Sequence, residues 1–160
     1  MDRGTTSPYD DGTMRDYTKI DAWKLVDDLT LEIYTKTRSF PREEIYGLTS
    51  QMRRASCSVP ANIVEGSSRE SKKDYLHFLY IARGSLSETQ YFVHLARRLG
   101  YLPNADAEQL IAQTKQAFAC LHGLIQSVEK EAGKLGKLVA SVSSVIVLAL
   151  CSRGPWSVVP

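Results

Sequence analysis

The longest regular feature of the sequence is a run of apolar residues at helical spacing between Lys72 and Leu99. Such side chains recur every three or four residues, which predicts one face of an amphipathic helix. Ser71 and Asp74 resemble a capping box at its start, and Gly100 ends it. A helix of roughly 30 residues spans ~40 Å, so the rest of the chain has to pack along it. The apolar face contains Tyr75, Phe78, Leu79, Ala82, Leu86, Phe92, Val93 and Ala96.

Three other stretches have the same spacing and flank this helix in the sequence. Two begin at residues that suit an N-cap, Asp21 and Asn104, and one begins at Pro41, which suits a first helical turn. They cover residues 21–39, 41–66 and about 104–137. Because the connections are short, neighbouring helices should run antiparallel. The chain is therefore expected to be all-α, an antiparallel up-down-up-down four-helix bundle over residues 19–137.

The second helix of this bundle contains a proline. Pro60 removes a backbone donor and clashes with the carbonyl of Ser56, so a kink is expected there. Gly66 is expected to close the same helix in the left-handed conformation. Gly133 and Gly136 are expected to weaken the end of the fourth helix.

The two ends of the chain differ in composition from the bundle. Residues 1–18 are rich in Gly, Asp and Thr without an apolar period, which predicts a disordered leader. Residues 138–160 form a mostly apolar tail whose longest uncharged run is too short for a bilayer, since spanning takes ~20 residues. For this tail three interpretations stay open: an extra packed helix or strand, a disordered end, or a surface anchor.

Composition favours one cytoplasmic domain. The chain has 160 residues, 43% of them hydrophobic and 24% charged, which is ordinary for a globular protein with one core. The net charge is only +2, so any nucleic-acid contact has to come from a local basic surface. Cys57, Cys120 and Cys151 show no paired spacing, and the chain does not open like a signal peptide. We expect reduced thiols and no membrane insertion.

The sequence offers no recognisable catalytic arrangement. His77, His94 and His122 lack the spacing of metal ligands. Ser-His-Asp arrangements, phosphate-binding glycine loops and the Glu-x-x-His signature of di-iron bundles are also missing from the pattern. We therefore expect a protein that is not an enzyme, with no catalytic residues, no metal and no cofactor.

The back of the 72–99 helix, opposite its apolar face, is basic and aromatic. Basic side chains interleaved with tyrosines suit phosphate contacts together with stacking on exposed bases. An alternative stays open, in which the tyrosines pack against a neighbouring subunit and the charges solvate the rim. The residues in question are Arg69, Lys72, Lys73, Arg83, Arg97 and Arg98, with Tyr80 and Tyr91.

A second polar surface runs along the helix with the proline. Its side chains recur at helical spacing beside an apolar face, so they need hydrogen-bonding partners. One interpretation is a solvated face or an inter-helix hydrogen-bond network, and the other is a recognition or assembly surface. The polar residues are Gln51, Arg54, Ser58, Asn62 and Glu65. Arg53 and Arg54 are further candidates for nucleic-acid contact.

Several short segments of this region together resemble a known protein family. They are Tyr46-Gly47-Leu48-Thr49, Arg53-Arg54-Ala55, Pro60-Ala61-Asn62-Ile63, Glu65-Gly66 and Gly84-Ser85-Leu86. The chain from about residue 20 to 137 resembles the four-helix-bundle proteins of ribosomal RNA intervening sequences, to which the accessory variability proteins of diversity-generating retroelements are related. The leader and the tail lie outside the resemblance.

This resemblance implies a bacterial antiparallel bundle that assembles into a ring, typically a pentamer, with a basic surface. In the retroelement branch it implies a nucleic-acid-binding partner of a reverse transcriptase, and it supplies no catalytic residues. Two hypotheses follow. In the first, the chain is a ring-forming bundle that binds RNA or DNA with weak sequence preference. In the second, the same surfaces contact subunits or a protein partner without nucleic acid.

Overall fold

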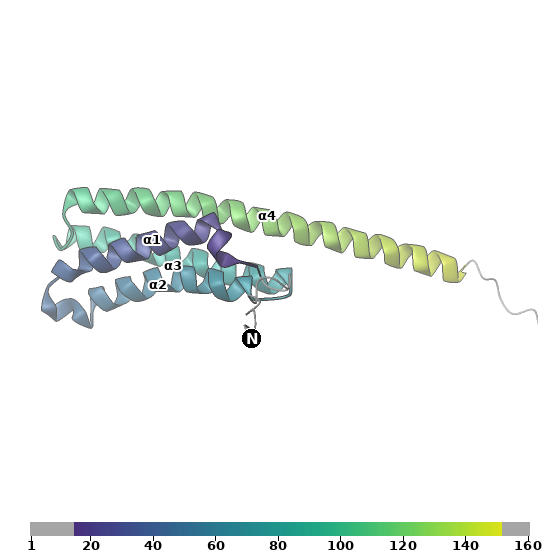
Figure 1. The fold of residues 1–160 in the computed structure, drawn as a ribbon, viewed down its shortest axis with the longest axis horizontal. Helices are drawn as coiled ribbons and strands as arrows, with labels where there is room; N and C mark the ends of the chain where they lie inside the picture. The colour runs from purple at the N-terminus through teal and green to yellow at the C-terminus, as the bar shows by residue number, and fades with distance from the viewer. Residues whose placement is uncertain (1–14, 152–160) are drawn as a thin grey trace, which may run out of the picture.

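The computed structural model describes the backbone of residues 15–151 and the side chains of residues 15–133. This part of the chain folds into four α-helices: α1 (Asp21–Lys36), α2 (Leu48–Ser67), α3 (Lys72–Arg98) and α4 (Asn104–Cys151). Short 3₁₀ turns lie at Tyr17–Lys19, Thr37–Ser39 and Arg42–Ile45. Each helix packs against two others, in the cyclic order α1, α2, α3, α4 (Figure 1). The predicted all-α antiparallel bundle is confirmed.

The core lies between the four helices, and each of them contributes buried aliphatic side chains. The predicted apolar face of α3 is largely correct, although Phe78 and Phe92 lie at its margins and are only half-buried. The helix therefore presents its other side outward. Core residues with almost no exposed area include Val26, Leu29, Ile33, Met52, Val59, Ile63, Tyr75, Leu79, Leu86, Leu110, Leu121 and Ile125.

The connection between α1 and α2 differs from the prediction of one helix from Pro41 onward. A 3₁₀ turn at Arg42–Ile45 is followed by Gly47, and α2 begins only at Leu48. The Glu44 carboxylate accepts the Leu48 N–H at 2.8 Å. A Cβ on Gly47 would lie 2.5 Å from that carboxylate oxygen. The side chain of Glu44 thus caps α2 from outside the helix, which the periodicity of the sequence does not encode.

The second helix is bent by 37°, as expected for a helix with an internal proline. Pro60 lies inside α2 and is buried, so its ring nitrogen offers no hydrogen to the Ser56 carbonyl. The Thr30 hydroxyl of α1 lies 3.0 Å from that carbonyl oxygen and 2.8 Å from the Val26 carbonyl oxygen, so its one proton is shared between the two acceptors. A side chain of the neighbouring helix therefore takes the place of the missing backbone donor.

Gly66 does not close α2 in the left-handed conformation, and the prediction for this residue was wrong. It lies within the helix, which ends at Ser67, and a Cβ there would come within 2.9 Å of both Tyr75 Cδ2 and Phe78 Cβ. Among the described residues, positive φ occurs at Gly100, with a value of 75°, in the turn after α3. The role of Gly66 is close packing of α2 on α3.

At the two ends of the described chain, Arg15 packs onto the bundle and α4 continues past it. Arg15 lies against α3, with its guanidinium 4.6 Å from the centre of the Tyr75 ring. Residues 1–14 of the expected leader and residues 152–160 of the tail lie outside the described residues. Gly133 and Gly136 do not end α4, whose backbone continues to Cys151 and passes beyond the other three helices (Figure 1). No helix in the described range is long and apolar enough to cross a membrane.

Candidate nucleic-acid interface

The outer surface of α3 carries the basic side chains on which the nucleic-acid hypothesis depends. The apolar face of α3 is turned into the core, so residues on its far side point to solvent. Lys73, Arg83 and Arg98 are exposed, and none of them forms an ion pair with a described residue. These three cations remain available for anionic ligands.

Two other basic residues of this surface form ion pairs near the start of α3, where it follows α2. Arg69 lies in the connection before α3, where it pairs with the Glu65 carboxylate and covers the Phe78 ring at 4.8 Å. Lys72 reaches across to α4, with its Nζ 2.8 Å from a Glu131 carboxylate oxygen. The residue spacing along one helix does not show these acids, because Glu65 belongs to α2 and Glu131 to α4.

Arg97 is engaged at the opposite end of α3. Its Nε donates to the side-chain oxygen of Asn104 at 2.9 Å, and its Nη2 lies 3.9 Å from a Glu108 carboxylate oxygen. Both partners belong to the first turn and a half of α4. Arg97 therefore ties the α3–α4 turn together rather than presenting an unpaired charge.

The two tyrosines of α3 have different surroundings. The Tyr80 hydroxyl donates to the Glu129 carboxylate of α4, and this hydrogen bond raises the pKa of the Tyr80 phenol. The Arg83 guanidinium lies 4.9 Å from the centre of the Tyr80 ring. Tyr91, by contrast, is 58% exposed, with its hydroxyl unbonded within the described part of the chain. The Tyr91 ring contacts the Phe92 ring, in a tilted arrangement with centroids 5.6 Å apart, and its remaining exposed area is open to a stacking partner.

Tyr91 also borders a shallow hollow between α3 and α4, with a volume of about 340 Å³. The other lining residues offer a hydroxyl, an amide, an imidazole and one aliphatic surface. They are Ser87, Gln90, His94 and Ile111. Hydrogen-bonding groups beside an exposed ring are what a stacked base edge needs.

The second polar surface, along α2, is divided: some of its side chains form hydrogen bonds within the bundle, and others are exposed to solvent. The Ser58 hydroxyl lies 2.9 Å from the Ser85 hydroxyl of α3, and Asn62 Nδ2 donates to the Ser58 carbonyl at 2.7 Å. Gln51 and Arg54 are exposed and border a second shallow hollow. Ser58 therefore links α2 to α3, while Asn62 bonds to Ser58 within α2, and both side chains are only partly available to a partner.

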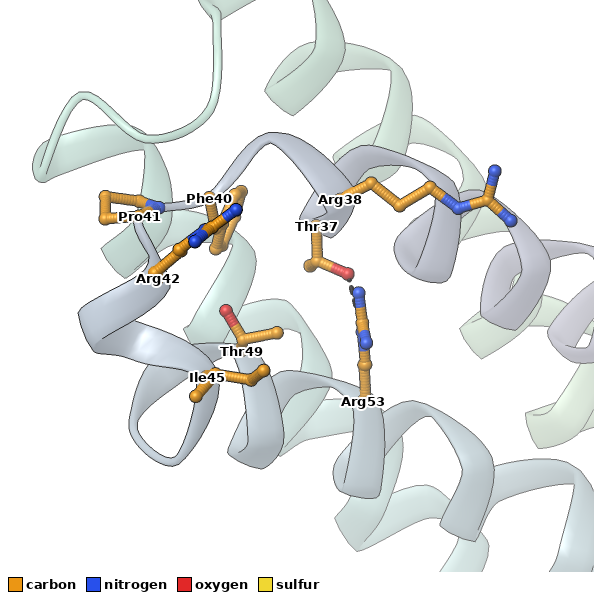
Figure 2. Close-up of a pocket in the computed structure, with 8 residues that line it drawn as sticks. All are labelled: Thr37, Arg38, Phe40, Pro41, Arg42, Ile45, Thr49 and Arg53. Carbon is orange, nitrogen blue, oxygen red and sulfur yellow. Dashed lines mark hydrogen bonds between the residues drawn. The ribbon is translucent and has the colours of Figure 1, made fainter.

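Arg53 lies away from the α3 surface, at the α1–α2 connection (Figure 2). Its Nε donates to the Thr37 hydroxyl at 2.8 Å, and its guanidinium lies 4.9 Å from the centre of the Tyr34 ring. Arg38 and Arg42 line the same pocket as Arg53. Helical periodicity does not single out these two arginines, because only the turn between the helices brings them beside Arg53.

The described side chains contain no group of three His, Cys, Asp or Glu residues close enough to share a metal ion. Cys57 and Cys120 are free thiols in this part of the chain. Burial raises the pKa of the Cys120 thiol, which keeps it protonated and unreactive at neutral pH.

The chain matches the family described as "23S rRNA-intervening sequence protein" over residues 18–123. No curated protein matches it in sequence. A crystal structure of a protein of unknown function from the S23 ribosomal protein family of Bacteroides thetaiotaomicron VPI-5482 has a TM-score of 0.61. The two are 21% identical, over 66% of this chain and 95% of that one, so the likeness shows the fold alone. With well over half of its residues matched, the chain belongs to the 23S rRNA-intervening sequence protein family.

Proposed function

We propose that this protein is a non-enzymatic bundle that binds nucleic acid through the outer surface of α3, as a homo-oligomeric ring in the cytoplasm. The observation that carries the proposal is the position of Tyr91 on α3, between two arginines that form no ion pair with a described residue. Its exposed ring lies about two helical turns, or ~11 Å, from Arg83 on one side and from Arg98 on the other. Neither arginine is paired with an acid of the described chain. RNA is the first ligand to test, in keeping with the family description.

The physical basis is phosphate contact combined with stacking. Three unpaired cations, Lys73, Arg83 and Arg98, neutralise phosphates and release counterions, which lowers affinity as salt rises. With about three phosphate contacts per subunit, log K should fall against log[salt] with a slope of about −2 to −3. Phosphate contacts do not read sequence, so sequence preference should be weak.

The test is fluorescence anisotropy with labelled structured RNA, single-stranded DNA and duplex DNA, at low and physiological salt. The variant Arg83→Glu/Arg98→Glu should abolish binding at physiological salt. Its matched control is Lys24→Glu/Lys115→Glu, which makes the same change in net charge on α1 and α4. Light scattering verifies that both variants keep the wild-type assembly size.

Two results would overturn the proposal. One is the absence of binding by the wild-type protein at low salt. The other is equal loss of binding in the control variant, which would show that only total charge matters. A Tyr91→Ala variant separates stacking from phosphate contact. It should weaken the binding of single strands by about 1–3 kcal/mol while leaving the slope of log K against log[salt] unchanged.

A protein-interaction scaffold is the second candidate function, and exposed apolar residues favour it. Large hydrophobic side chains at several places on the surface are at least 39% exposed. They are Leu31, Tyr34, Ile45, Tyr46, Tyr80, Ile81, Tyr91 and Leu99. Their positions on different helices suit the head-to-tail contacts of a ring, in which two unlike surfaces meet. A reverse transcriptase is the protein partner that the family resemblance suggests.

Light scattering tests the assembly directly. A pentamer has five times the 17.9 kDa mass of the chain. A monomer at all concentrations would contradict the ring, whereas a pentamer that binds no nucleic acid would favour the scaffold.

A further inference from the structure

The α1–α2 connection forms a pocket of about 270 Å³ that is separate from the α3 surface. Three arginines line it, and no acidic residue does. Figure 2 shows that the Arg38 side chain runs away from the other lining residues, whereas Arg42 and Arg53 stay beside the pocket. The full lining is Thr37, Arg38, Phe40, Pro41, Arg42, Ile45, Thr49 and Arg53. None of the three arginines forms an ion pair with a described acid.

The Thr49 hydroxyl is the second, independent observation at this pocket. Thr49 is 4% exposed, and its Oγ1 has no hydrogen-bond partner. Two other buried threonines of the bundle, Thr89 and Thr114, each donate to the carbonyl four residues earlier, at 2.9 and 2.7 Å. Thr49 does not, and its hydroxyl points toward the space beside Phe40 and Arg42 (Figure 2). A buried hydroxyl without a partner is costly, so an acceptor bound in the pocket would stabilise it.

Arg53 is held in place before any ligand arrives. Its Nε donates to Thr37, and its guanidinium stacks on Tyr34. These contacts leave the terminal nitrogens of the guanidinium free to donate to an anion. Thr49 and Arg53 are four residues apart on α2, so their side chains lie on the same face. Thr49 is also in the first turn of α2, where the helix dipole favours negative charge.

We propose that this pocket binds a phosphoryl group through Arg42, Arg53 and the Thr49 hydroxyl. Two guanidinium groups from different segments and one hydroxyl donor suit the several oxygens of a tetrahedral anion, whereas one arginine satisfies a planar carboxylate. The volume lies just below that of pockets for drug-sized ligands, which favours a phosphate with a short substituent. Free phosphate and the terminal phosphate of a nucleic acid share this chemistry.

The test is calorimetric titration of the full chain with inorganic phosphate at low ionic strength, with acetate as the comparison anion. We expect saturable binding of phosphate, weakened at least tenfold in each of Thr49→Val, Arg42→Gln and Arg53→Gln. The matched control is Arg54→Gln, which removes the same charge from the next position of α2, outside the pocket. It should bind phosphate as the wild type does.

A second titration distinguishes the two sources of the phosphate. A single-stranded oligonucleotide with a 5′-phosphate is compared with the same strand ending in a 5′-hydroxyl. Tighter binding of the phosphorylated strand, lost in Thr49→Val, assigns the pocket to a nucleic-acid terminus. Equal binding of the two strands, together with saturable binding of inorganic phosphate, assigns it to a free small phosphate.

Phosphate binding at this pocket should not depend on the basic residues of the α3 surface. The Arg83→Glu/Arg98→Glu variant should bind inorganic phosphate normally even if it loses long nucleic acids. Absence of saturable phosphate binding by the wild type would overturn the site. Equal affinity for acetate, or an equal loss in Arg54→Gln, would overturn it as well. Should Arg53→Gln fail to fold, Arg42→Gln still decides, because the Arg42 side chain is exposed and forms no ion pair with a described residue.

Discussion

At the scale of single residues, Gly66 sets the closest approach between α2 and α3. A methyl group there would lie 2.9 Å from two aromatic side chains, at the Cδ2 of the buried Tyr75 and at the Cβ of Phe78. We expect Gly66→Ala to lower the free energy of unfolding by about 1–3 kcal/mol, because overpacking forces the helices apart. Chemical denaturation followed by circular dichroism measures the change.

Gly84 provides the control for this substitution. It lies in the middle of α3, with no atom within 4 Å of the position of a Cβ. Gly84→Ala should therefore raise the free energy of unfolding of the isolated bundle by roughly 0.5–1 kcal/mol, through helix propensity alone. If both substitutions had the same effect, close packing at Gly66 would be refuted.

Tyr75 makes the stability of the bundle sensitive to alkaline pH. Its ring is 2% exposed, and burial raises the pKa of the phenol above its ordinary value, which the nearby Arg15 guanidinium only partly opposes. The unfolded chain then releases this proton at lower pH than the folded one. The buried, protonated Tyr75 phenol therefore contributes fully to the free energy of unfolding below pH ~10, the ordinary pKa of tyrosine. This contribution is lost as pH rises through the folded-state pKa.

We expect thermal unfolding midpoints of the wild-type protein to fall between pH 10 and pH 11. Tyr75→Phe should flatten part of this decline, since phenylalanine does not ionise. Tyr34, Tyr80 and Tyr101 also have raised pKa values and will keep a residual slope in the variant. Parallel curves for the two proteins would contradict the assignment to Tyr75.

At the scale of helices, α1 and α2 are linked through a carbonyl that Pro60 leaves without its helical donor. The Thr30 hydroxyl fills that place on the Ser56 oxygen. Thr30→Val should lower the free energy of unfolding by about 1–3 kcal/mol, because it leaves this oxygen buried without a partner. Pro60→Ala restores a backbone N–H for the same oxygen.

The double variant tests this coupling. In the Pro60→Ala background, Thr30→Val should cost clearly less than in the wild type, with an interaction energy of about 0.5–3 kcal/mol in a double-mutant cycle. Thr114→Val is the control, because its hydroxyl bonds only within α4, to the Leu110 carbonyl at 2.7 Å. Additive effects of Thr30→Val and Pro60→Ala would show that the two residues act independently.

At the scale of the whole molecule, the backbone of α4 extends beyond the other three helices (Figure 1). Val128 is the last buried side chain of the described residues, and Glu131 forms the last cross-helix ion pair, with Lys72. A chain that ends after Gly133 should therefore fold with a free energy of unfolding within ~0.5 kcal/mol of the full chain, as for changes outside a core. A loss of more than ~2 kcal/mol would show that later residues of α4 contribute to the fold.

The sequence by itself determined the four helices and the face that each turns inward. Both depend on neighbours three and four positions away, so periodicity is enough to predict them. The apolar face of α3 shows this, since most of its predicted residues are buried. Local rules were less successful at helix ends: Glu44 starts α2 through a side-chain contact, and Gly66 serves packing rather than termination.

Only the tertiary structure decided which charges remain free. Lys72 and Arg97 meet acids of α4, whereas Arg83 and Arg98, on the same helix, do not. Ion pairs between helices depend on the distance between side chains far apart in the sequence, which no spacing rule encodes. The pocket at the α1–α2 connection has the same origin, because Arg42 and Arg53 come together only where the chain turns and α2 begins.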